Sequence, residues 1–303
     1  MYSQQSSDGL LLGFPEYREP AERLAKAAGL SYAGVDIHTF PDGESRLLLP
    51  EKLPSRVAFC RTLDQPNGKL LELILAAASA REQGVEHCIL VAPYLCYMRQ
   101  DKAFSAGEVV SQGIIGKLLA DYFTEILTVD AHLHRISQLS EAIPARVAMN
   151  LKATQPMARF LATQLDNPLL VGPDQESEQW VTAIAAHDRL DFVVAYKQRF
   201  GDREVAVKLP PASYEGRDIV LLDDVASTGR TLEVAARELE PHAPASISVL
   251  VTHALFVGDA QQRLAAAGVE NIWSCDSVSH QSNAVPLDEI LGNALAGIFA
   301  AAA

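Results

Sequence analysis

The chain has little cysteine, and this limits the kinds of site it can hold. Only 4 of its 303 residues are cysteine, and no two of them form a C-x-x-C pair. Cys60, Cys88 and Cys275 lie in or beside apolar, strand-like runs. That setting favours packed thiols in a reducing cytosol.

Basic residues are also scarce. The sequence has 25 lysines and arginines against 38 acidic residues, a formal net charge of −13. This balance argues against nonspecific binding to nucleic acid or to an anionic membrane. It leaves room for a local basic site, which an anionic nucleotide would need.

Long apolar segments are missing too. No run approaches the roughly 20 apolar residues that span a bilayer. The first nine residues, Met1–Gly9, lack the charged-then-apolar design of a secretory signal. We therefore expect a cytoplasmic protein with no membrane partner.

The chain does have alternating strand-like and helix-like segments, with a hydrophobic content of 49%. Such alternation predicts an α/β fold built from mostly parallel sheets flanked by helices. The length suits two domains, which we place at residues 1–148 and 149–303, with the boundary near 145–153. The last predicted helix, 287–299, could belong with either domain. Strands are predicted at 10–14, 46–49, 56–60, 87–91, 125–129, 168–171, 191–194, 219–222, 247–251 and 271–275, and helices at 18–28, 69–83, 109–123, 154–164, 176–186, 259–267 and 287–299.

The most informative stretch runs from Ile219 to Leu232. An apolar strand, Ile219–Leu222, is followed by two carboxylates, Asp223 and Asp224, and then by a turn that opens a helix. A helix N-terminus at the carboxyl edge of a sheet presents backbone N–H groups to an anion. The acids are suited to ribose hydroxyls or a hydrated Mg²⁺. The alternative is an ordinary strand, turn and helix with polar turn residues. The turn consists of Ser227, Thr228, Gly229, Arg230 and Thr231.

A second polar cluster follows the strand 87–91. Arg99 and Lys102 are suited to neutralise phosphate oxygens, and Gln100 to read a base edge by paired hydrogen bonds. Asp101 lies between them, and aromatic residues surround the group. A solvated loop is the alternative interpretation.

Together these stretches resemble one enzyme family. Asp223-Asp224-x-x-x-Thr228-Gly229-x-Thr231 resembles the phosphoribosyl-binding motif of phosphoribosyltransferases and phosphoribosyl-diphosphate synthetases. Pro93-Tyr94-x-x-Tyr97-x-Arg99-Gln100-Asp101 resembles the ATP-binding segment of the synthetases, also called ribose-phosphate diphosphokinases. Further similar motifs occur in family order. These are Phe40-x-Asp42-Gly43-Glu44, Asp130-Ala131-His132, Gly172-Pro173-Asp174 and Lys197-Gln198-Arg199. The segment Lys102-Ala103-Phe104-x-x-Gly107-Glu108 resembles the archaeal-type branch of the family more than the common bacterial one.

The resemblance implies two phosphoribosyltransferase-type domains and a specific reaction. The diphosphoryl group of ATP would pass to the C1 hydroxyl of ribose 5-phosphate, giving phosphoribosyl diphosphate and AMP, with Mg²⁺ as cofactor. An ATP site shared across subunits implies a homo-oligomer, at least a dimer. The implied roles are catalysis for Lys197 and Arg199, metal binding for His132 and Asp174, ATP binding for Asp42, Gly43, Glu44, Arg99, Gln100, Asp101 and Lys102, and ribose 5-phosphate binding for Asp223, Asp224, Ser227, Thr228, Gly229, Arg230 and Thr231.

Two other functions remain open at this point. One is a phosphoribosyltransferase that consumes phosphoribosyl diphosphate, and the other is a non-catalytic regulatory relative of the synthetase. The segment Gln175–Gln179 stands where the family has Gly-Gly and a basic residue, and Arg230 where many members have glycine. Two of the candidate site residues also have purely structural interpretations. Asp174 could be a helix N-cap, and His132 could be an ordinary surface histidine.

Overall fold

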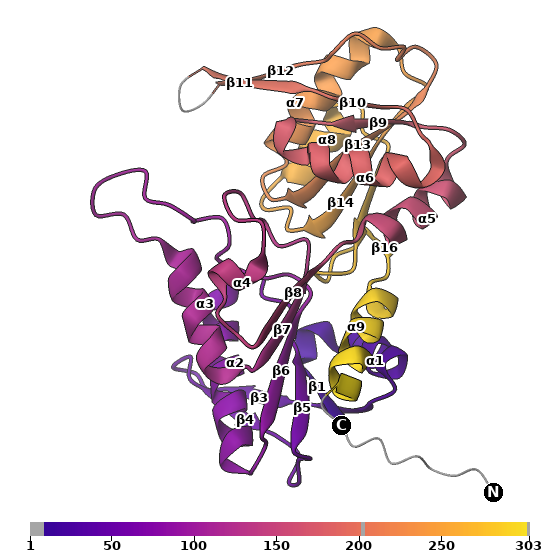
Figure 1. Ribbon diagram of the computed structural model, residues 1–303. Helices are drawn as coiled ribbons and strands as arrows, with labels where there is room; N and C mark the ends of the chain where they lie inside the picture. Colours follow the sequence, from indigo (N-terminus) through magenta and orange to yellow (C-terminus); the bar gives the residue numbers. More distant parts are fainter. Residues whose placement is uncertain (1–8, 201–203, 302–303) are drawn as a thin grey trace, which may run out of the picture. The chain divides into compact units, whose positions relative to one another are not determined.

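The computed structural model describes residues 9–200 and 204–301, with the side chains of all of these except 197–206. The chain divides into two compact units, one of Met1–Leu151 with Leu287–Ala303 and the other of Lys152–Pro286 (Figure 1).

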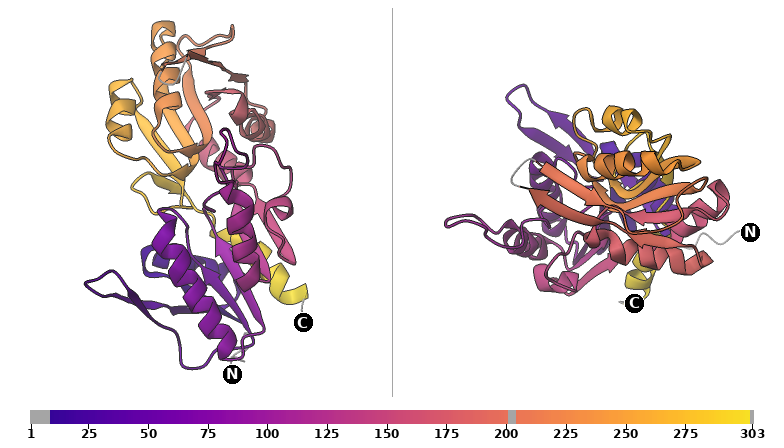
Figure 2. Two further views of the ribbon diagram at one scale, coloured as in Figure 1. Left: turned by 90° about the vertical axis from the view of Figure 1, so that its left-hand side faces the viewer. Right: turned by 90° about the horizontal axis from the view of Figure 1, so that it is seen from above.

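The first unit contains a six-stranded sheet in the order β2-β1-β5-β6-β7-β8, with every neighbouring pair parallel. Its central strands β5, β6 and β7 are mostly apolar and buried, as expected where helices cover both faces of a parallel sheet. A separate antiparallel hairpin, β3–β4, projects away from this sheet (Figure 2). The elements are β1 Leu10–Gly13, α1 Arg18–Ala28, β2 Ser31–Gly34, β3 Asp36–Thr39, β4 Ser45–Leu48, β5 Arg56–Cys60, α2 Pro66–Glu82, β6 His87–Ala92, α3 Ser111–Tyr122, β7 Glu125–Val129, α4 Leu139–Ala142, β8 Val147–Leu151 and α9 Asp288–Ala301, with a 3₁₀ turn at Pro15–Tyr17.

The second unit contains a sheet of the same kind in the order β10-β9-β13-β14-β15-β16, again parallel throughout. An antiparallel pair, β11–β12, is separate from it. The elements are α5 Thr154–Gln164, β9 Leu169–Gly172, α6 Glu178–Asp188, β10 Phe192–Val194, β11 Tyr196–Phe200, β12 Glu204–Lys208, β13 Asp218–Ala226, α7 Arg230–Leu239, β14 Ser246–Ala254, α8 Ala260–Ala266, β15 Asn271–Cys275 and β16 Asn283–Val285, with 3₁₀ turns at Gln175–Ser177 and Glu240–His242.

The prediction of an α/β fold with mostly parallel sheets flanked by helices is therefore confirmed. Several predicted bounds were wrong. The strand expected to end at Leu222 continues to Ala226, because β14 pairs with it beyond the two carboxylates. The helix expected from Glu176 begins at Glu178, after a 3₁₀ turn at Gln175–Ser177.

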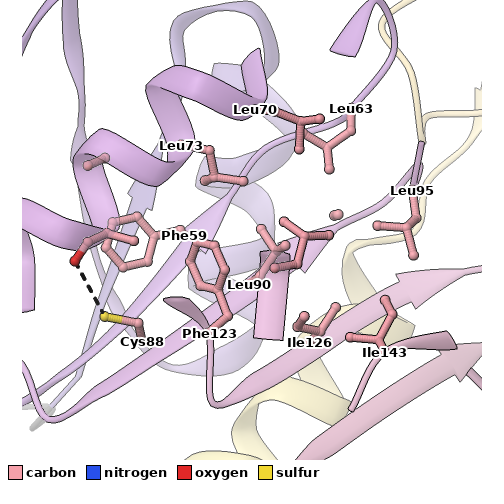
Figure 3. Close-up of a cluster of buried hydrophobic side chains, with 14 of the residues drawn as sticks. Phe59, Leu63, Leu70, Leu73, Cys88, Leu90, Leu95, Phe123, Ile126 and Ile143 are labelled. Atoms are coloured by element: carbon pink, nitrogen blue, oxygen red, sulfur yellow. Dashed lines mark hydrogen bonds between the residues drawn. The ribbon is translucent and has the colours of Figure 1, made fainter. Parts of the chain in front are cut away.

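A compact apolar core lies between α2, α3 and the sheet of the first unit (Figure 3). The rings of Phe59 and Phe123 meet edge to face with their centroids 5.7 Å apart. Leu73 and Leu90 are fully buried nearby. The Sγ atom of Cys88 lies 4.0 Å from the Ala77 carbonyl oxygen. All four cysteines are buried free thiols.

The last helix, α9, belongs to the first unit, where it packs against α1 (Figure 1). The guanidinium group of Arg56 donates to the carbonyl oxygens of Ile298 and Phe299 at 2.9 and 2.6 Å. These carbonyls lie in the last turn of the helix, where the backbone has no intrahelical donors of its own. Arg56 thus fastens the C-terminal end of α9 to β5. Over the described part of the chain, no helix combines the length and apolar character needed to cross a membrane.

Candidate functional site in two parts

In the second unit, three carboxylates gather at the carboxyl edge of the sheet. Asp174 follows β9, and Asp223 and Asp224 lie on the neighbouring strand β13. Asp174 and Asp224 are 7% and 4% exposed. Burial, and then the charges of Asp224 and Asp174, raise the pKa of Asp223 well above its ordinary value. The sheet therefore concentrates negative charge at this edge.

Asp174 also shapes its own loop. Its carboxylate accepts from the Glu176 backbone N–H at 3.1 Å, as an N-cap does, and its carbonyl accepts from the Ser177 hydroxyl at 2.6 Å. The N-cap role considered from the sequence is therefore confirmed, for a 3₁₀ turn that leads into α6. Glu176 stands in this turn, where the resembling family has glycine and a basic residue.

The turn between β13 and α7 has the form expected of an anion site. Gly229 is the N-cap of α7 and has a left-handed backbone with φ 66°. Its carbonyl accepts the first helical bond from the Glu233 N–H at 2.9 Å. The first turn of a helix concentrates backbone N–H groups and positive dipole charge. Ser227, Thr228, Arg230 and Thr231 surround this helix start, with Ser227 and Thr231 half-buried and Thr228 exposed.

Arg230 does not extend freely from this turn. Its Nη1 lies 3.1 Å from Glu233 Oε2, a carboxylate that Arg237 and Arg263 also contact. Burial favours a raised pKa for Glu233, but the arginines outweigh it and lower the pKa. Arg263 also donates to the carbonyl of Thr228 at 2.6 Å. Neither Glu233 nor Arg263 was predicted from the sequence. The i,i+3 spacing of Arg230 and Glu233 on α7 is a local signal for the first, whereas no local pattern links Arg263 of α8 to the turn.

In the first unit, His132 follows a sharp bend at the end of β7. Asp130 is fully buried and has φ 40°, which is uncommon for a residue with a side chain. Its N–H donates to the Leu151 carbonyl at 2.9 Å, and the Ala131 N–H donates to Asn150 at 2.9 Å. These bonds to β8 hold the bend. His132 comes next and is half-buried.

The segment after β6 carries four of the seven residues of the predicted ATP site, Arg99–Lys102. Arg99 and Lys102 are exposed, and the ammonium group of Lys102 lies 4.7 Å from the ring centre of Phe104. The amide of Gln100 donates to Glu108 at 2.6 Å and to the Lys102 carbonyl at 3.2 Å. In this state the Gln100 amide group is therefore engaged within its own loop.

Glu108 organises this loop. It accepts from the N–H groups of Phe104 and Ser105 at 2.6 and 2.9 Å, besides the Gln100 amide. These hydrogen bonds lower the pKa of Glu108, and the bond from the Phe104 N–H has the largest effect. The sequence predicted no separate role for Glu108, because its partners are recognisable only once the loop is folded.

Asp101 joins the segment to the loop after β7. Its Oδ1 lies 2.6 Å from Arg135 Nη1, and its side chain is 4% exposed. Its Oδ2 is buried and has no hydrogen-bond partner among the residues that the structure describes. Since Arg135 follows His132 by three residues, Asp101 and His132 belong to one cluster of loops in the first unit.

Asp42, Gly43 and Glu44 form the tip of the β3–β4 hairpin. The N–H of Glu44 donates to Asp42 Oδ1 at 3.2 Å, and Gly43 has φ 93°. Asp42 therefore shapes the turn at the tip of this hairpin. All three residues are exposed.

The candidate catalytic residues Lys197 and Arg199 lie on β11, opposite Val207 and Val205 of β12. Their side chains fall outside the described part of the structure.

Comparison with known proteins finds a family match in each of the two units. Residues 10–125 match the family model of the N-terminal domain of ribose phosphate pyrophosphokinase, and residues 149–289 match that of the phosphoribosyl transferase domain. The ribose-phosphate pyrophosphokinase of Methanopyrus kandleri is 30% identical over 295 residues, covering 95% of this chain and 97% of its own. Ribose-phosphate pyrophosphokinase 2 of Archaeoglobus fulgidus is 30% identical, covering 89% and 94% of the two chains.

A solved structure extends the likeness to the fold. The crystal structure of phosphoribosylpyrophosphate synthetase from Mycobacterium smegmatis matches with a TM-score of 0.79 at 18% identity, covering 97% of this chain and 99% of that one. With two phosphoribosyltransferase-type domains and full-length relatives of this kind, the chain belongs to the ribose-phosphate pyrophosphokinase family. The archaeal source of these relatives agrees with the archaeal-type branch expected from the sequence.

Proposed function

We propose that the chain is a ribose-phosphate diphosphokinase. It transfers the diphosphoryl group of ATP to the C1 hydroxyl of ribose 5-phosphate, giving phosphoribosyl diphosphate and AMP. The ribose hydroxyl attacks the β-phosphorus of ATP, so no protein side chain has to act as a covalent nucleophile. The chain must hold two anions in line and neutralise charge on the transferring group.

One observation carries this proposal. Residues 10–125 match the N-terminal domain of ribose phosphate pyrophosphokinase, in addition to the phosphoribosyl transferase domain at 149–289. A phosphoribosyltransferase that consumes phosphoribosyl diphosphate has no need of the first match. The combination therefore favours the synthetase over the transferase.

We assign the ribose 5-phosphate site to the second unit. The turn Ser227–Thr231 binds the 5-phosphate through the N-terminal turn of α7, and Asp223 and Asp224 hold the ribose hydroxyls. The left-handed Gly229 supports this role, because it lets the backbone approach a phosphate closely. Arg230 is tied to Glu233, so we place it beside the phosphate rather than upon it.

Magnesium fits the carboxylate edge of the second unit. Burial and the neighbouring carboxylates Asp224 and Asp174 raise the pKa of Asp223. A bound cation would offset the repulsion between these carboxylates. Among the described residues, no three ligating side chains already form a complete metal cage. Mg²⁺ does not need one, since it takes one or two carboxylates and keeps waters and phosphate oxygens as its other ligands. Asp174 would hold it here, and His132 is the proposed contact in the first unit. When bound, Mg²⁺ neutralises charge on the phosphate oxygens.

We assign ATP to the first unit. Arg99 and Lys102 supply positive charge to the phosphates, and their exposure leaves them accessible. Gln100 and Asp101 position the nucleotide, and Gln100 exchanges its bond to Glu108 for the ligand. Asp42, Gly43 and Glu44 form the tip of a projecting hairpin, which is suited to reach the ATP of a neighbouring copy in an oligomer of at least two chains.

Lys197 and Arg199 complete the proposed machinery. They stand on the antiparallel pair β11–β12, and two cations here would stabilise the transferring diphosphoryl group as its charge shifts. The buried free thiols support a cytoplasmic setting for the reaction.

The test is incubation of the protein with ATP, Mg²⁺ and ribose 5-phosphate, with AMP and phosphoribosyl diphosphate measured together. Equimolar formation of both products, dependent on ribose 5-phosphate, is expected. Binding of ATP and ribose 5-phosphate without AMP formation would instead establish the regulatory relative. Formation of nucleotide from phosphoribosyl diphosphate and a free base would establish the transferase.

A further inference from the structure

The turn Ser227–Thr231 has a peptide unit that needs an external support. Gly229 has φ 66°, and glycine exchanges readily between backbone conformations of either sign. The peptide between Thr228 and Gly229 can therefore rotate at little cost. One orientation offers the Gly229 N–H to an anion, and the opposite one offers the Thr228 carbonyl oxygen, which repels it.

Arg263, which lies on α8, fixes the orientation of the peptide unit between Thr228 and Gly229. Its Nη2 donates to the Thr228 carbonyl oxygen at 2.6 Å. In a trans peptide the C=O and N–H bonds point in opposite directions. With the carbonyl turned toward Arg263, the Gly229 N–H points away from it. The orientation of this donor is thus determined by a side chain that lies 35 residues further along the chain.

The guanidinium group of Arg263 is itself well anchored. Its Nε lies 3.1 Å from Oε2 of Glu233, whose side chain is only 4% exposed, and its Nη1 pairs with Asp259. Arg263 therefore uses each of its three nitrogens on a different partner. A planar fork of this kind loses little freedom on forming each bond, which suits it to a positioning role.

Arg237 provides a natural contrast. It approaches the same carboxylate, with Nε and Nη2 each 3.4 Å from Glu233 Oε1. It has no described bond to the turn. The two arginines thus share the Glu233 contact, and only Arg263 adds the bond to Thr228.

We propose that Arg263 is a positioning residue for ribose 5-phosphate, which it serves by holding the 228–229 peptide with its N–H toward the 5-phosphate. The assignment rests on the proposed function, since it takes the turn to be the phosphate site. It concerns binding of one substrate and leaves the ATP site of the first unit unaffected.

The experiment compares Arg263→Ala, Arg263→Lys and the control Arg237→Ala in the full-length protein. Binding of ribose 5-phosphate is measured by calorimetry, and the KM values for ribose 5-phosphate and ATP are measured separately. Loss of an oriented hydrogen bond to a charged group corresponds to roughly a tenfold loss of affinity or more. We expect this loss for ribose 5-phosphate in Arg263→Ala, with the KM for ATP within about twofold. We expect partial recovery in Arg263→Lys, and near wild-type binding in Arg237→Ala.

Unchanged affinity in Arg263→Ala, an equal loss in Arg237→Ala, or an equal rise in both KM values would overturn the assignment. Circular dichroism checks that each variant folds. If Arg263→Ala does not fold, the ribose 5-phosphate affinities of Arg263→Lys and Arg237→Lys are compared instead. Only Arg263→Lys alters the bond to Thr228, so only it should bind ribose 5-phosphate more weakly. If the wild-type protein binds ATP but no ribose 5-phosphate, the proposed function fails and this assignment with it. If it binds both, a failure concerns Arg263 alone.

Discussion

The close contact of α9 with α1 depends on a glycine, and replacing it tests how the last helix is attached. A Cβ atom at the buried Gly292 would lie 2.6 Å from the Ala27 Cβ, 3.0 Å from the Ala27 carbonyl carbon and 3.1 Å from the Ala28 nitrogen. Two of these three atoms belong to the α1 backbone and have no rotamer by which to move away. Gly292→Ala therefore forces the two helices apart.

The magnitude follows from two opposing effects. Overpacking costs about 1–3 kcal/mol, and contact with backbone favours the upper part of that range. Alanine in place of glycine within a helix returns about 1 kcal/mol. We expect a net loss of about 1–2 kcal/mol. For a unit of this size that lowers Tm by roughly 2–8 °C.

Gly297 is the matched control, because it lies on the same helix and a Cβ there meets nothing within 4 Å. Gly297→Ala should stabilise the protein by about 0.5–1 kcal/mol through helix propensity alone. Calorimetric unfolding of the full chain compares the two variants, which should shift Tm in opposite directions. A shift of the same sign and size in both would refute the reasoning.

Ala27→Gly combined with Gly292→Ala gives a second check. The double variant removes the 2.6 Å contact and leaves those at 3.0 and 3.1 Å. It should therefore be more stable than the sum of the single changes predicts. Strict additivity would mean that the helices do not meet at this point.

Three further predictions concern the proposed site. Because the pKa of Asp223 is raised in the folded protein, the folded state binds the Asp223 proton more tightly than the unfolded state does. The protonated Asp223 therefore stabilises the fold at a pH below its ordinary pKa, and this stabilisation is lost as the pH rises through the raised pKa. In the absence of Mg²⁺, Asp223→Asn should therefore have a higher Tm than the wild type, and the difference should grow with pH. Its turnover should fall. A Tm difference that does not change with pH would contradict this. Lys197→Ala should lower kcat by orders of magnitude while circular dichroism stays unchanged, and near-normal turnover would remove Lys197 from the machinery. Glu108→Gln weakens the bonds from Phe104, Ser105 and Gln100, so the KM for ATP should rise several-fold and that for ribose 5-phosphate should stay constant; equal changes in both would point to a general loss of structure.

The sequence by itself determined the class of fold and the segments of the candidate site. Continuous apolar runs such as Ile219–Leu222 and His87–Val91 alternate with helical patterns, and burial on both faces of a parallel sheet accounts for that alternation. The acids and turn after Leu222 were recognisable because strand end, carboxylates and helix start are consecutive in the chain. All of these signals are local.

Only the tertiary structure decided what depends on contacts between distant residues. The strand β13 passes Asp223 and reaches Ala226, because β14 pairs with it there. The last helix could have joined either domain, and it packs on α1 through the small surface of Gly292. Arg263 meets Thr228 because α8 lies beside the turn. Periodicity cannot reveal such pairings, since they come from how elements pack and not from the order of residues within one element.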